Sequence, residues 1–215
     1  MKEQTKAKIE DLVDRYPALN FVYKDILESL NIIIKCYKSG GKLLVCGNGG
    51  SAADAQHIVG ELMKSFILPR KISSDLEIQM NNIAGEDCRY LMDNLQGALP
   101  AISLQGELAL SSAYANDVAP DLSFAQQIFG LGNKNDVLLA ISTSGHSKNI
   151  IYACKVAKLK GMKIVSLTGI TGGKLKLQSD VTICAPANET YKIQEYHLPI
   201  YHTICLALEE EFFGE

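Results

Sequence analysis

The sequence lacks the features by which nucleic-acid-binding and membrane proteins are usually detected. It has no cluster of lysine and arginine, and its 21 basic side chains are outnumbered by 24 acidic ones, for a net charge of −3. Charge therefore gives no reason to expect nucleic acid as a partner. No apolar run approaches the length of a membrane span, and the mixed charges of residues 1–6 precede no apolar stretch of the secretory type. We expect a cytoplasmic protein with no membrane or nucleic-acid partner.

The six cysteines lack the spacing of a metal or redox motif. No two of them form a C-x-x-C pair, and several lie inside apolar runs. Buried, reduced thiols are typical of this pattern in an intracellular protein. The sequence also has no internal repeat and no low-complexity tract. Its 215 residues, 47% of them apolar, predict one well-buried α/β domain over residues 1–215.

Short apolar runs alternate with segments of helical periodicity from residue 42 onward. This alternation predicts parallel βαβ units with right-handed crossovers, and hence a doubly wound α/β sheet. Residues 1–39 carry two helical stripes, interrupted at Pro17, and we expect N-terminal helices that cover the sheet or contact another subunit. The predicted strands are residues 42–46, 100–104, 136–141, 162–167 and 181–184.

Residues 67–99 interrupt the alternation. Turn-forming residues occupy 69–71 and 73–75, and residues 89–95 are compatible with a short helix. A connection of this length in a compact domain is either functional or a local subdomain.

Two loops carry residue types that bind phosphate. Residues 47–51 read Gly-Asn-Gly-Gly-Ser, and residues 142–147 read Ser-Thr-Ser-Gly-His-Ser. Each loop follows a predicted strand and precedes a predicted helix, an arrangement that directs backbone N–H groups and the positive end of a helix dipole at an anion. Both loops fall at the carboxyl ends of strands, where open α/β sheets bind their ligands. The sequence therefore predicts a site for a small phosphorylated molecule.

The helix that follows the first loop carries His57 and Glu61. Their spacing of four residues places them on one helix face, a turn or more beyond the loop. Such a pair can hold a metal ion from two sides, or act as an acid and a base beside a substrate. A solvated interaction on a helix surface is the alternative, and the position beside the loop favours function.

The C-terminal helical segment carries a second polar group. Gln194 and His202 are two turns apart and offset by about 80°, so both can line one side of a cleft. His197 falls on another face and is predicted to be structural or interfacial, while a satisfied core histidine is the alternative for His202. Pro199 removes a backbone donor, so we expect the helix to kink or begin close to it.

Two further segments, residues 116–117 and the loop 168–173 after a predicted strand, are candidates for the edge of the site. Asp117, after Asn116, either caps the next helical segment or orients a substrate hydroxyl, and capping is the simpler interpretation. The small-residue loop 168–173 is expected to shape the carboxyl edge of the sheet rather than to contact ligand.

Three motifs, residues 47–57, 141–150 and 193–197, resemble those of the sugar isomerase (SIS) domain family and occur in the same order. The likeness spans most of residues 20–213 and is greatest to the phosphoheptose isomerase branch. That resemblance implies a five-stranded parallel sheet between helices, flavodoxin-like in its winding. It also implies a homotetramer with active sites at subunit interfaces, and conversion of sedoheptulose 7-phosphate to D-glycero-D-manno-heptose 7-phosphate.

The resemblance further implies roles for individual residues. Glu61 and His202 match positions with acid/base roles, and Asn116 and Asp117 match an element near the substrate. The positions that match zinc ligands are His57, Glu61, Gln194 and His202. The positions that match substrate and phosphate contacts are Asn48, Gly49, Ser51, Ser142, Thr143, Ser144, Ser147 and Gln194.

Ketose–aldose isomerisation moves one proton between adjacent carbons through an ene-diol(ate). It needs a base, an acid and a positive group near the developing oxyanion. Glu61 is the expected base and His202 the expected acid, with zinc able to polarise the carbonyl. Because a metal-bound carboxylate is a weaker base, ligation and base catalysis compete for Glu61.

Two departures from the family pattern bear on the substrate. His146 stands where the family has asparagine, and it either hydrogen-bonds phosphate or projects into solvent. Residues 67–99 exceed the usual connection, and they are candidates for a lid or for a changed assembly. The alternatives are an isomerase of another phosphosugar and a non-catalytic SIS module of the replication-initiator-associating type. That module lacks counterparts of Glu61 and His202, which favours the enzyme.

Overall fold

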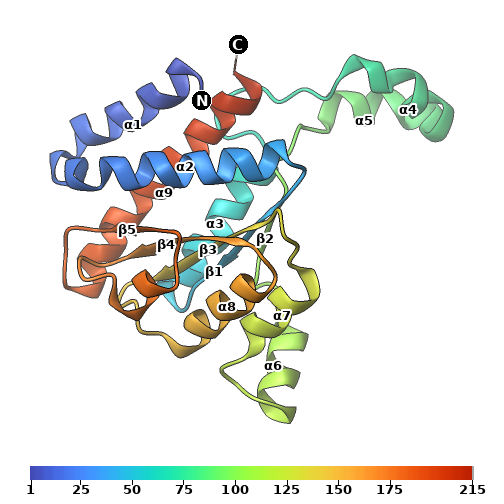
Figure 1. The fold of residues 1–215 in the computed structure, drawn as a ribbon. Helices are drawn as coiled ribbons and strands as arrows, with labels where there is room; N and C mark the ends of the chain where they lie inside the picture. The colour runs from blue at the N-terminus through green and yellow to red at the C-terminus, as the bar shows by residue number, and fades with distance from the viewer. Residues whose placement is uncertain (215) are drawn as a thin grey trace.

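A five-stranded sheet lies at the centre of the structure, a computed structural model that describes residues 1–214 (Figure 1). The strand order is β2-β1-β3-β4-β5, and every neighbouring pair is parallel. The predicted doubly wound α/β fold is confirmed, and each predicted strand end lies within one residue of the observed one. The strands are β1 (Leu43–Cys46), β2 (Ala101–Ser103), β3 (Val137–Ser142), β4 (Lys163–Thr168) and β5 (Val181–Cys184).

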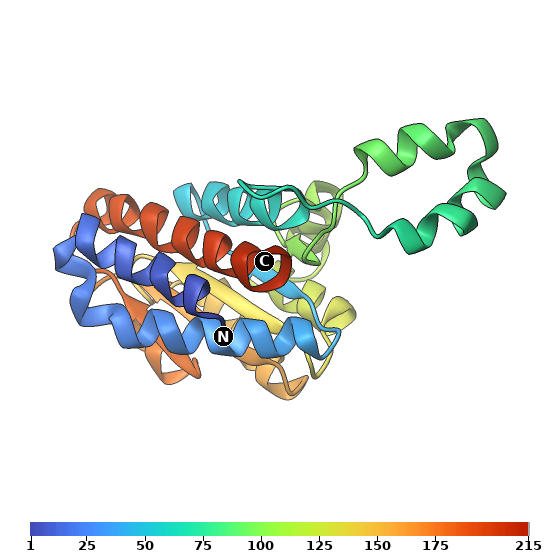
Figure 2. The same cartoon turned by 90° about the horizontal axis from the view of Figure 1, so that it is seen from above.

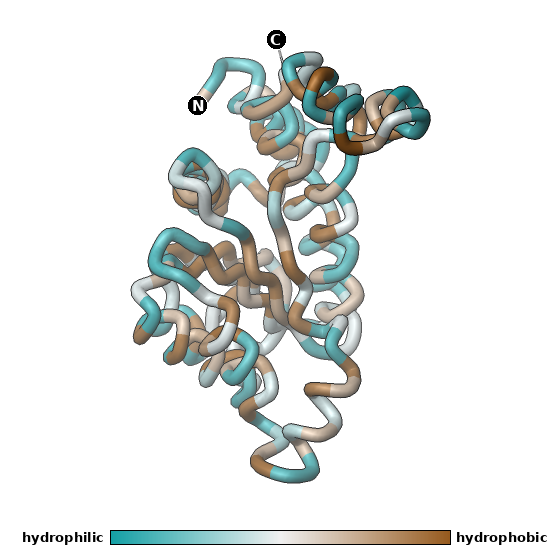
Figure 3. The backbone as a smooth tube through the Cα atoms, turned by 90° about the vertical axis from the view of Figure 1, so that its right-hand side faces the viewer, coloured by the Kyte–Doolittle hydropathy of each residue, from teal (hydrophilic) through white to brown (hydrophobic). Residues whose placement is uncertain are grey.

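The central strands are apolar on both faces because helices cover both sides of the sheet. Every residue of β1 and β3 is buried, as expected for parallel strands between two helical layers. Leu43 and Val45 belong to one hydrophobic core, and Leu44 and Cys46 belong to the other. Figure 3 shows hydrophobic segments, in brown, at the centre of the molecule as well as on the surrounding helices.

One helical layer contains α1, α2, α3 and α9, and the other contains α7 and α8. In Figure 2, α1 and α2 lie beside α9. The α-helices are α1 (Glu3–Arg15), α2 (Tyr23–Lys38), α3 (Gly50–Met63), α4 (Glu77–Ala84), α5 (Cys88–Asn94), α6 (Leu108–Asp117), α7 (Ser123–Leu131), α8 (Lys148–Leu159) and α9 (Thr190–Phe213). The 3₁₀ segments are η1 (Pro17–Val22), η2 (Ser74–Leu76), η3 (Gly85–Asp87) and η4 (Gly173–Leu177).

Residues 72–95, here called the arm, extend away from this core (Figures 1 and 2). The arm contains α4 and α5, and Cys88 is its one buried residue. Its two ends lie side by side, since Lys71 pairs with Gln96 in an antiparallel bridge and the Gly97 N–H donates to the Arg70 carbonyl at 2.6 Å. The long connection is thus a local two-helix excursion from the sheet.

Of the two alternatives predicted at Pro199, a helix start close to the proline is wrong, and a kink stays a prediction. Helix α9 begins at Thr190 and continues through Pro199 to Phe213, so the helix does not begin near the proline. The proline removes one backbone hydrogen bond, but Pro199 and its neighbour Ile200 are both buried. Packing of the helix on the sheet therefore outweighs the lost bond. Within residues 1–214, no helix combines the length and the apolar character needed to cross a bilayer.

Candidate active site

The two phosphate-type loops lie next to each other at the carboxyl edge of the sheet. Strands β1 and β3, which they follow, are neighbours. Asn48 of the first loop and Asn149 at the start of α8 exchange two amide hydrogen bonds, of 3.0 and 2.8 Å. The N-termini of α3 and α8 therefore adjoin the same edge, where their dipoles favour an anion.

Glycines allow the first loop to approach α9. Gly49 has a φ of 56°, in the left-handed region that glycine tolerates best. At Gly50 a Cβ atom would collide with the side-chain amide of Gln194. This close approach brings Gln194 to the N-terminus of α3. Ser51, the second residue of that helix, is buried.

The second loop presents its hydroxyls at graded depth. Ser142 is buried and its Oγ lies 3.1 Å from Ser147 Oγ. Thr143 is half-buried, and Ser144 is exposed with its Oγ accepting from the His146 N–H at 3.2 Å. The His146 side chain is exposed. The loop thus presents hydroxyls at different depths along this edge of the sheet.

The loop after β4 supports the second loop from behind. The Gly169 N–H donates to the Thr143 carbonyl at 2.9 Å, and the Leu175 N–H donates to the Gly145 carbonyl at 2.9 Å. His197 Nε2 lies 3.1 Å from the Thr168 carbonyl oxygen, to which it donates as the N–H tautomer. The expectation that residues 168–173 shape the edge agrees with these contacts, and His197, fully buried, is structural.

The acid/base candidates gather where α3 and α9 run side by side. His57 Nε2 lies 3.2 Å from Glu61 Oε1, and His57 Nδ1 lies 3.0 Å from the Tyr201 hydroxyl. The imidazole rings of His57 and His202 are 5.0 Å apart, nearly perpendicular. The second carboxylate oxygen of Glu61 accepts from Lys64 at 3.0 Å. Three residues selected from the sequence, His57, Glu61 and His202, therefore form one cluster.

Burial sets the charge states around this cluster. Desolvation lowers the pKa of His202, with help from His57, while Glu61 opposes the shift. Burial also raises the pKa of the Tyr201 hydroxyl, reinforced by Asp54. The pKa of Asp54 is raised by burial, against the lowering effects of Tyr201 and His57. A neutral His202 next to a hydroxyl and carboxylates suits proton transfer near neutral pH.

Sequence reasoning missed Tyr201 and Asp54. Asp54 precedes His57 by three residues, so the i, i+3 spacing on one helix face was an available signal. Tyr201 contacts His57 across 144 residues of sequence. Its position next to His202 gives no sign of that contact without the fold.

Gln194, the fourth predicted zinc ligand, lies beside the start of α3, whereas His57 and Glu61 lie farther along that helix. It precedes His202 by eight residues on α9, about 12 Å along the helix axis, and its amide lies against Gly50. Within residues 1–214, no group of three His, Cys, Asp or Glu side chains is arranged to hold a metal ion. Two imidazoles and a carboxylate nonetheless suit zinc. His202 Nε2 is a buried nitrogen that has no hydrogen-bond partner among residues 1–214. The donor chemistry fits zinc, which stays a prediction.

Asn116 and Asp117 lie at the end of α6, and both are exposed. Asn116 Nδ2 donates to Asp117 Oδ1 at 2.8 Å. The expected capping role of Asp117 is wrong, because α7 begins only at Ser123 and its N-cap residue is Leu122. Asp117 instead ends the preceding helix, where a carboxylate opposes the helix dipole. That placement leaves its side chain available to a ligand or a neighbouring subunit.

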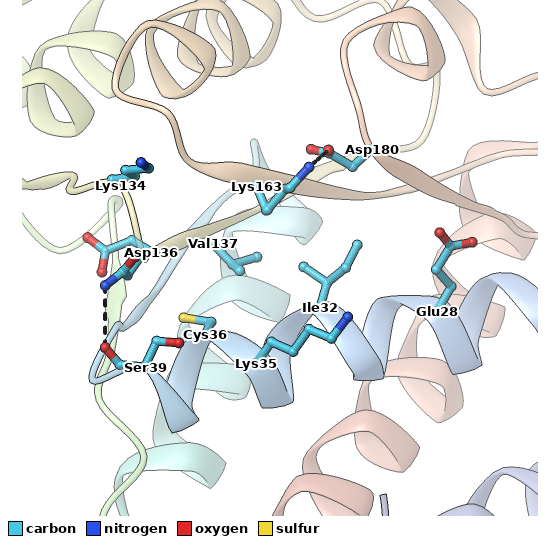
Figure 4. Close-up of a pocket in the computed structure, with 11 residues that line it drawn as sticks. Glu28, Ile32, Lys35, Cys36, Ser39, Lys134, Asp136, Val137, Lys163 and Asp180 are labelled. Carbon is cyan, nitrogen blue, oxygen red and sulfur yellow. Dashed lines mark hydrogen bonds and ion pairs between the residues drawn. The ribbon is translucent and has the colours of Figure 1, made fainter.

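A separate hollow of about 420 Å³ opens at the opposite edge of the sheet (Figure 4). Asp136, Lys163 and Asp180, which line it, precede or begin strands β3, β4 and β5. Lys163 is paired with Asp180 at 2.6 Å. The hollow therefore lies at the amino ends of the strands, away from the edge where such sheets bind ligands, and we assign the site to the loop edge.

The fold and the loop edge are those of an α/β protein of the SIS class, and models of the SIS domain match residues 18–88 and 100–208. The phosphoheptose isomerase of Helicobacter pylori (strain P12) is 37% identical over 98% of this chain and 91% of its own length. That of Geobacter sp. (strain M21) is 35% identical over 99% and 98%. The solved phosphoheptose isomerase of Neisseria gonorrhoeae superposes with a TM-score of 0.72 and 30% identity, covering 97% of this chain and 98% of the other. The chain belongs to the phosphoheptose isomerase family.

Proposed function

We propose that this protein isomerises sedoheptulose 7-phosphate to D-glycero-D-manno-heptose 7-phosphate. The observation that carries the proposal is the cluster of Glu61, His57 and His202 beside two phosphate-type loops, in a chain of this family. A non-catalytic binding module has no need of a carboxylate and an imidazole at this place. Their presence supports the enzyme over the module.

Glu61 is assigned as the group that carries a proton between C1 and C2, and His202 as the group that serves the neighbouring oxygen. An ene-diolate intermediate requires both functions on the substrate at once. Both carboxylate oxygens of Glu61 have partners, His57 and Lys64. Because Lys64 is 60% exposed, its ion pair is weak, and substrate binding can displace it to free the base.

The 7-phosphate is assigned to the loop edge, far along the substrate from the reacting carbons. Its proposed contacts are hydroxyl and amide groups that the two helix N-termini surround. Because phosphate recognition and proton transfer fall on different residues, substitutions at the two ends should separate KM from kcat. The proposed phosphate contacts are Asn48, Gly49, Ser51, Ser142, Thr143, Ser144 and Ser147.

We further infer that zinc binds at this cluster, through His57, Glu61 and His202 with Gln194 as the fourth candidate. A bound zinc ion supplies a Lewis acid for the substrate carbonyl. The support is the donor chemistry and the unpartnered His202 nitrogen. Gln194 requires a movement of its side chain away from Gly50 to take part.

A homotetramer with active sites at subunit interfaces is proposed as the working assembly. Helix α6 has no buried residue, and its surface includes Leu108, which is 78% exposed. Asn116 and Asp117 lie on this same helix, and a subunit interface here would bring them to a neighbour's substrate. The sugar phosphate is the proposed small-molecule partner.

The test is incubation with sedoheptulose 7-phosphate in deuterated water, followed by NMR with and without added zinc. We expect aldose formation with deuterium incorporated at the carbon that exchanges its proton. Glu61→Gln should lower kcat by about 10²- to 10⁴-fold, whereas Glu10→Gln, an exposed glutamate of α1, should leave it unchanged.

Two results would contradict the proposal. One is wild-type turnover in Glu61→Gln, which would remove the assigned base. The other is binding of the sugar phosphate by folded protein with no turnover in either condition, the behaviour expected of a binding module.

A further inference from the structure

We propose that Arg70 and Glu209 are positioning residues that hold the end of α3 against α9, and so fix Glu61 relative to His202. The inference rests on the proposed function for the roles of Glu61 and His202. Arg70 and Glu209 are separated by 139 residues of sequence, and neither belongs to the three family motifs. Arg70 contacts the backbone carbonyl of Glu61. Glu209 contacts the backbone of Phe66, whose ring packs against His202.

Arg70 closes the C-terminal end of α3. Its side chain is fully buried. Nη1 donates to the Leu62 carbonyl at 2.7 Å, and Nη2 donates to the Glu61 carbonyl at 3.0 Å. These carbonyls lack partners within the helix and lie at the negative end of its dipole. The guanidinium therefore holds the backbone of Glu61 itself, close to the point where α3 ends at Met63.

Glu209 holds the chain that leaves α3. Its carboxylate accepts from the Phe66, Ile67 and Leu68 N–H groups at 2.8, 2.9 and 3.0 Å, and from Arg70 Nε at 2.8 Å. Burial raises the pKa of Glu209, but these donors outweigh burial and the net shift is downward. The carboxylate thus stays charged and uses both its oxygens.

The held segment reaches the second catalytic group. The Phe66 ring lies 5.6 Å from the ring of His202, centre to centre. Arg70 also lies over the ring of Phe213, the last residue of α9, at 4.7 Å. Glu209 therefore sets the backbone of Phe66, and Phe66 in turn packs against His202, while Arg70 holds Glu61.

A buried ion pair is an inefficient way to gain stability, because desolvation offsets most of the attraction. It is an effective way to fix geometry, because four directional hydrogen bonds converge on one carboxylate. Proton transfers between one substrate and two side chains on different helices depend on such fixed geometry, and an error of about 1 Å costs on the order of 10²-fold in rate. Arg70 and Glu209 supply that constraint.

Glu211 provides a matched control on the same helix. It is also nearly buried, with a side chain 4% exposed, and its carboxylate accepts from the Lys2 N–H, Thr5 and Lys38 at 2.7, 3.0 and 3.1 Å. Its partners belong to the N-terminal segment and α2, not to α3. Glu209→Gln and Glu211→Gln therefore remove comparable buried carboxylates, of which one faces the site.

The experiment measures kcat, KM and thermal unfolding for both variants, together with the imidazole NMR signals of His202. We expect both variants to lose stability. Glu209→Gln should lower kcat about 10- to 100-fold with KM within about threefold, and should shift the His202 signals. Glu211→Gln should keep kcat within about twofold and leave those signals in place.

Arg70→Lys covers the case in which Glu209→Gln fails to fold. Lysine keeps a charge opposite Glu209 but loses the paired contacts to the Leu62 and Glu61 carbonyls, and we expect the same loss of kcat. Unchanged kcat and unchanged His202 signals in a folded Glu209 or Arg70 variant would overturn the inference. Absence of turnover in the wild type, with His202 signals that still respond to Glu209→Gln and not to Glu211→Gln, would instead refute the proposed substrate and keep the positioning role.

Discussion

His197 illustrates how burial determines what a histidine can do. Its ring is fully buried, Nε2 contacts the Thr168 carbonyl, and Nδ1 has no hydrogen-bond partner among residues 1–214. Desolvation lowers its pKa to about 4, although the bond to Thr168 opposes the shift. The residue is therefore neutral at physiological pH and serves the loop behind the phosphate-type hydroxyls.

This neutral state predicts a specific acid sensitivity. The unfolded chain takes up a proton near pH 6.5, and the folded chain only near pH 4. Folding stability from this residue is thus complete above pH 6.5 and is lost as pH falls toward 4. Between pH 7 and 4.5 the loss should be about 2 kcal/mol. His197→Gln, which keeps a donor to Thr168, should lack this component.

The measurement is the free energy of unfolding in urea at several pH values for both proteins. The other histidines and the carboxylates are common to the two, so the difference between the curves isolates His197. Parallel curves from pH 7 to 4.5 would mean that the folded protein protonates the ring as readily as the unfolded chain does, which would contradict the prediction.

Ser144 provides the corresponding prediction for phosphate binding. It is exposed, and its hydroxyl oxygen already accepts from the His146 N–H, which orients its proton outward. A hydrogen bond to a charged group contributes about 1.5–3 kcal/mol. Ser144→Ala should raise KM at least about tenfold with little change in kcat. Ser73→Ala, an exposed serine of the arm, should leave both constants unchanged, and steady-state kinetics that fail to distinguish the two variants would exclude a phosphate contact.

Much of the site could be predicted at the residue scale, and the limit has a physical cause. Spacing within one helix brings His57 and Glu61 together, whereas spacing alone left His202 as either a cleft or a core residue and the family resemblance selected it. The contacts of Tyr201 and Arg70 join segments more than a hundred residues apart, and no local pattern carries them. Arg70, within a stretch predicted as a turn, became visible only through the carboxylate it faces.

At the element scale, the strands were predictable because the apolar runs of the central strands β1 and β3 are buried on both faces between helical layers. In the arm, the short helix predicted at residues 89–95 is confirmed as α5, whereas α4 was not predicted because it lacks a periodic buried face. Ile78, Ile83 and Tyr90 are 77%, 85% and 71% exposed. Helix α9 does not begin near Pro199 as one alternative predicted, because tertiary packing holds this proline inside a helix that local propensity would end.

The structure of the arm predicts that its removal leaves the stability of the remaining fold nearly unchanged. Its ends meet at the bridge between Lys71 and Gln96, a geometry that a two-residue Asn-Gly turn can close. Because Cys88, its buried residue, contacts the Glu77 carbonyl within the arm, replacing residues 72–95 by this turn should change the free energy of unfolding by less than about 1 kcal/mol.

Urea unfolding followed by circular dichroism checks this expectation. A broad or lost transition would mean that the arm is part of the cooperative core. Turnover by the shortened protein at the wild-type rate would also exclude a lid function for the arm.

The whole molecule presents its two loops, the acid/base cluster and α6 on surfaces that one subunit leaves open. His57 is 43% exposed at its side chain, and the end of α6 carries Asn116 and Asp117 into solvent. A sugar phosphate bound here by one subunit would remain partly in water. Since ene-diolates decompose when exposed to solvent, the proposed closure by a neighbouring subunit would account for both open surfaces.

The assembly prediction follows from this arrangement. Leu108 is 78% exposed, so Leu108→Glu should leave the fold of a single subunit intact. If α6 lies in a subunit interface, the variant should lose the tetramer and most of its turnover together, because the substrate loses the residues supplied by a neighbour. Leu177→Glu, at the same exposure of 78%, is the matched control and should retain both.

Light scattering after size-exclusion chromatography measures the mass, which should be four times that of one chain for the wild type. A monomeric wild type, or a monomeric Leu108→Glu variant with full turnover, would show that one subunit contains the complete site.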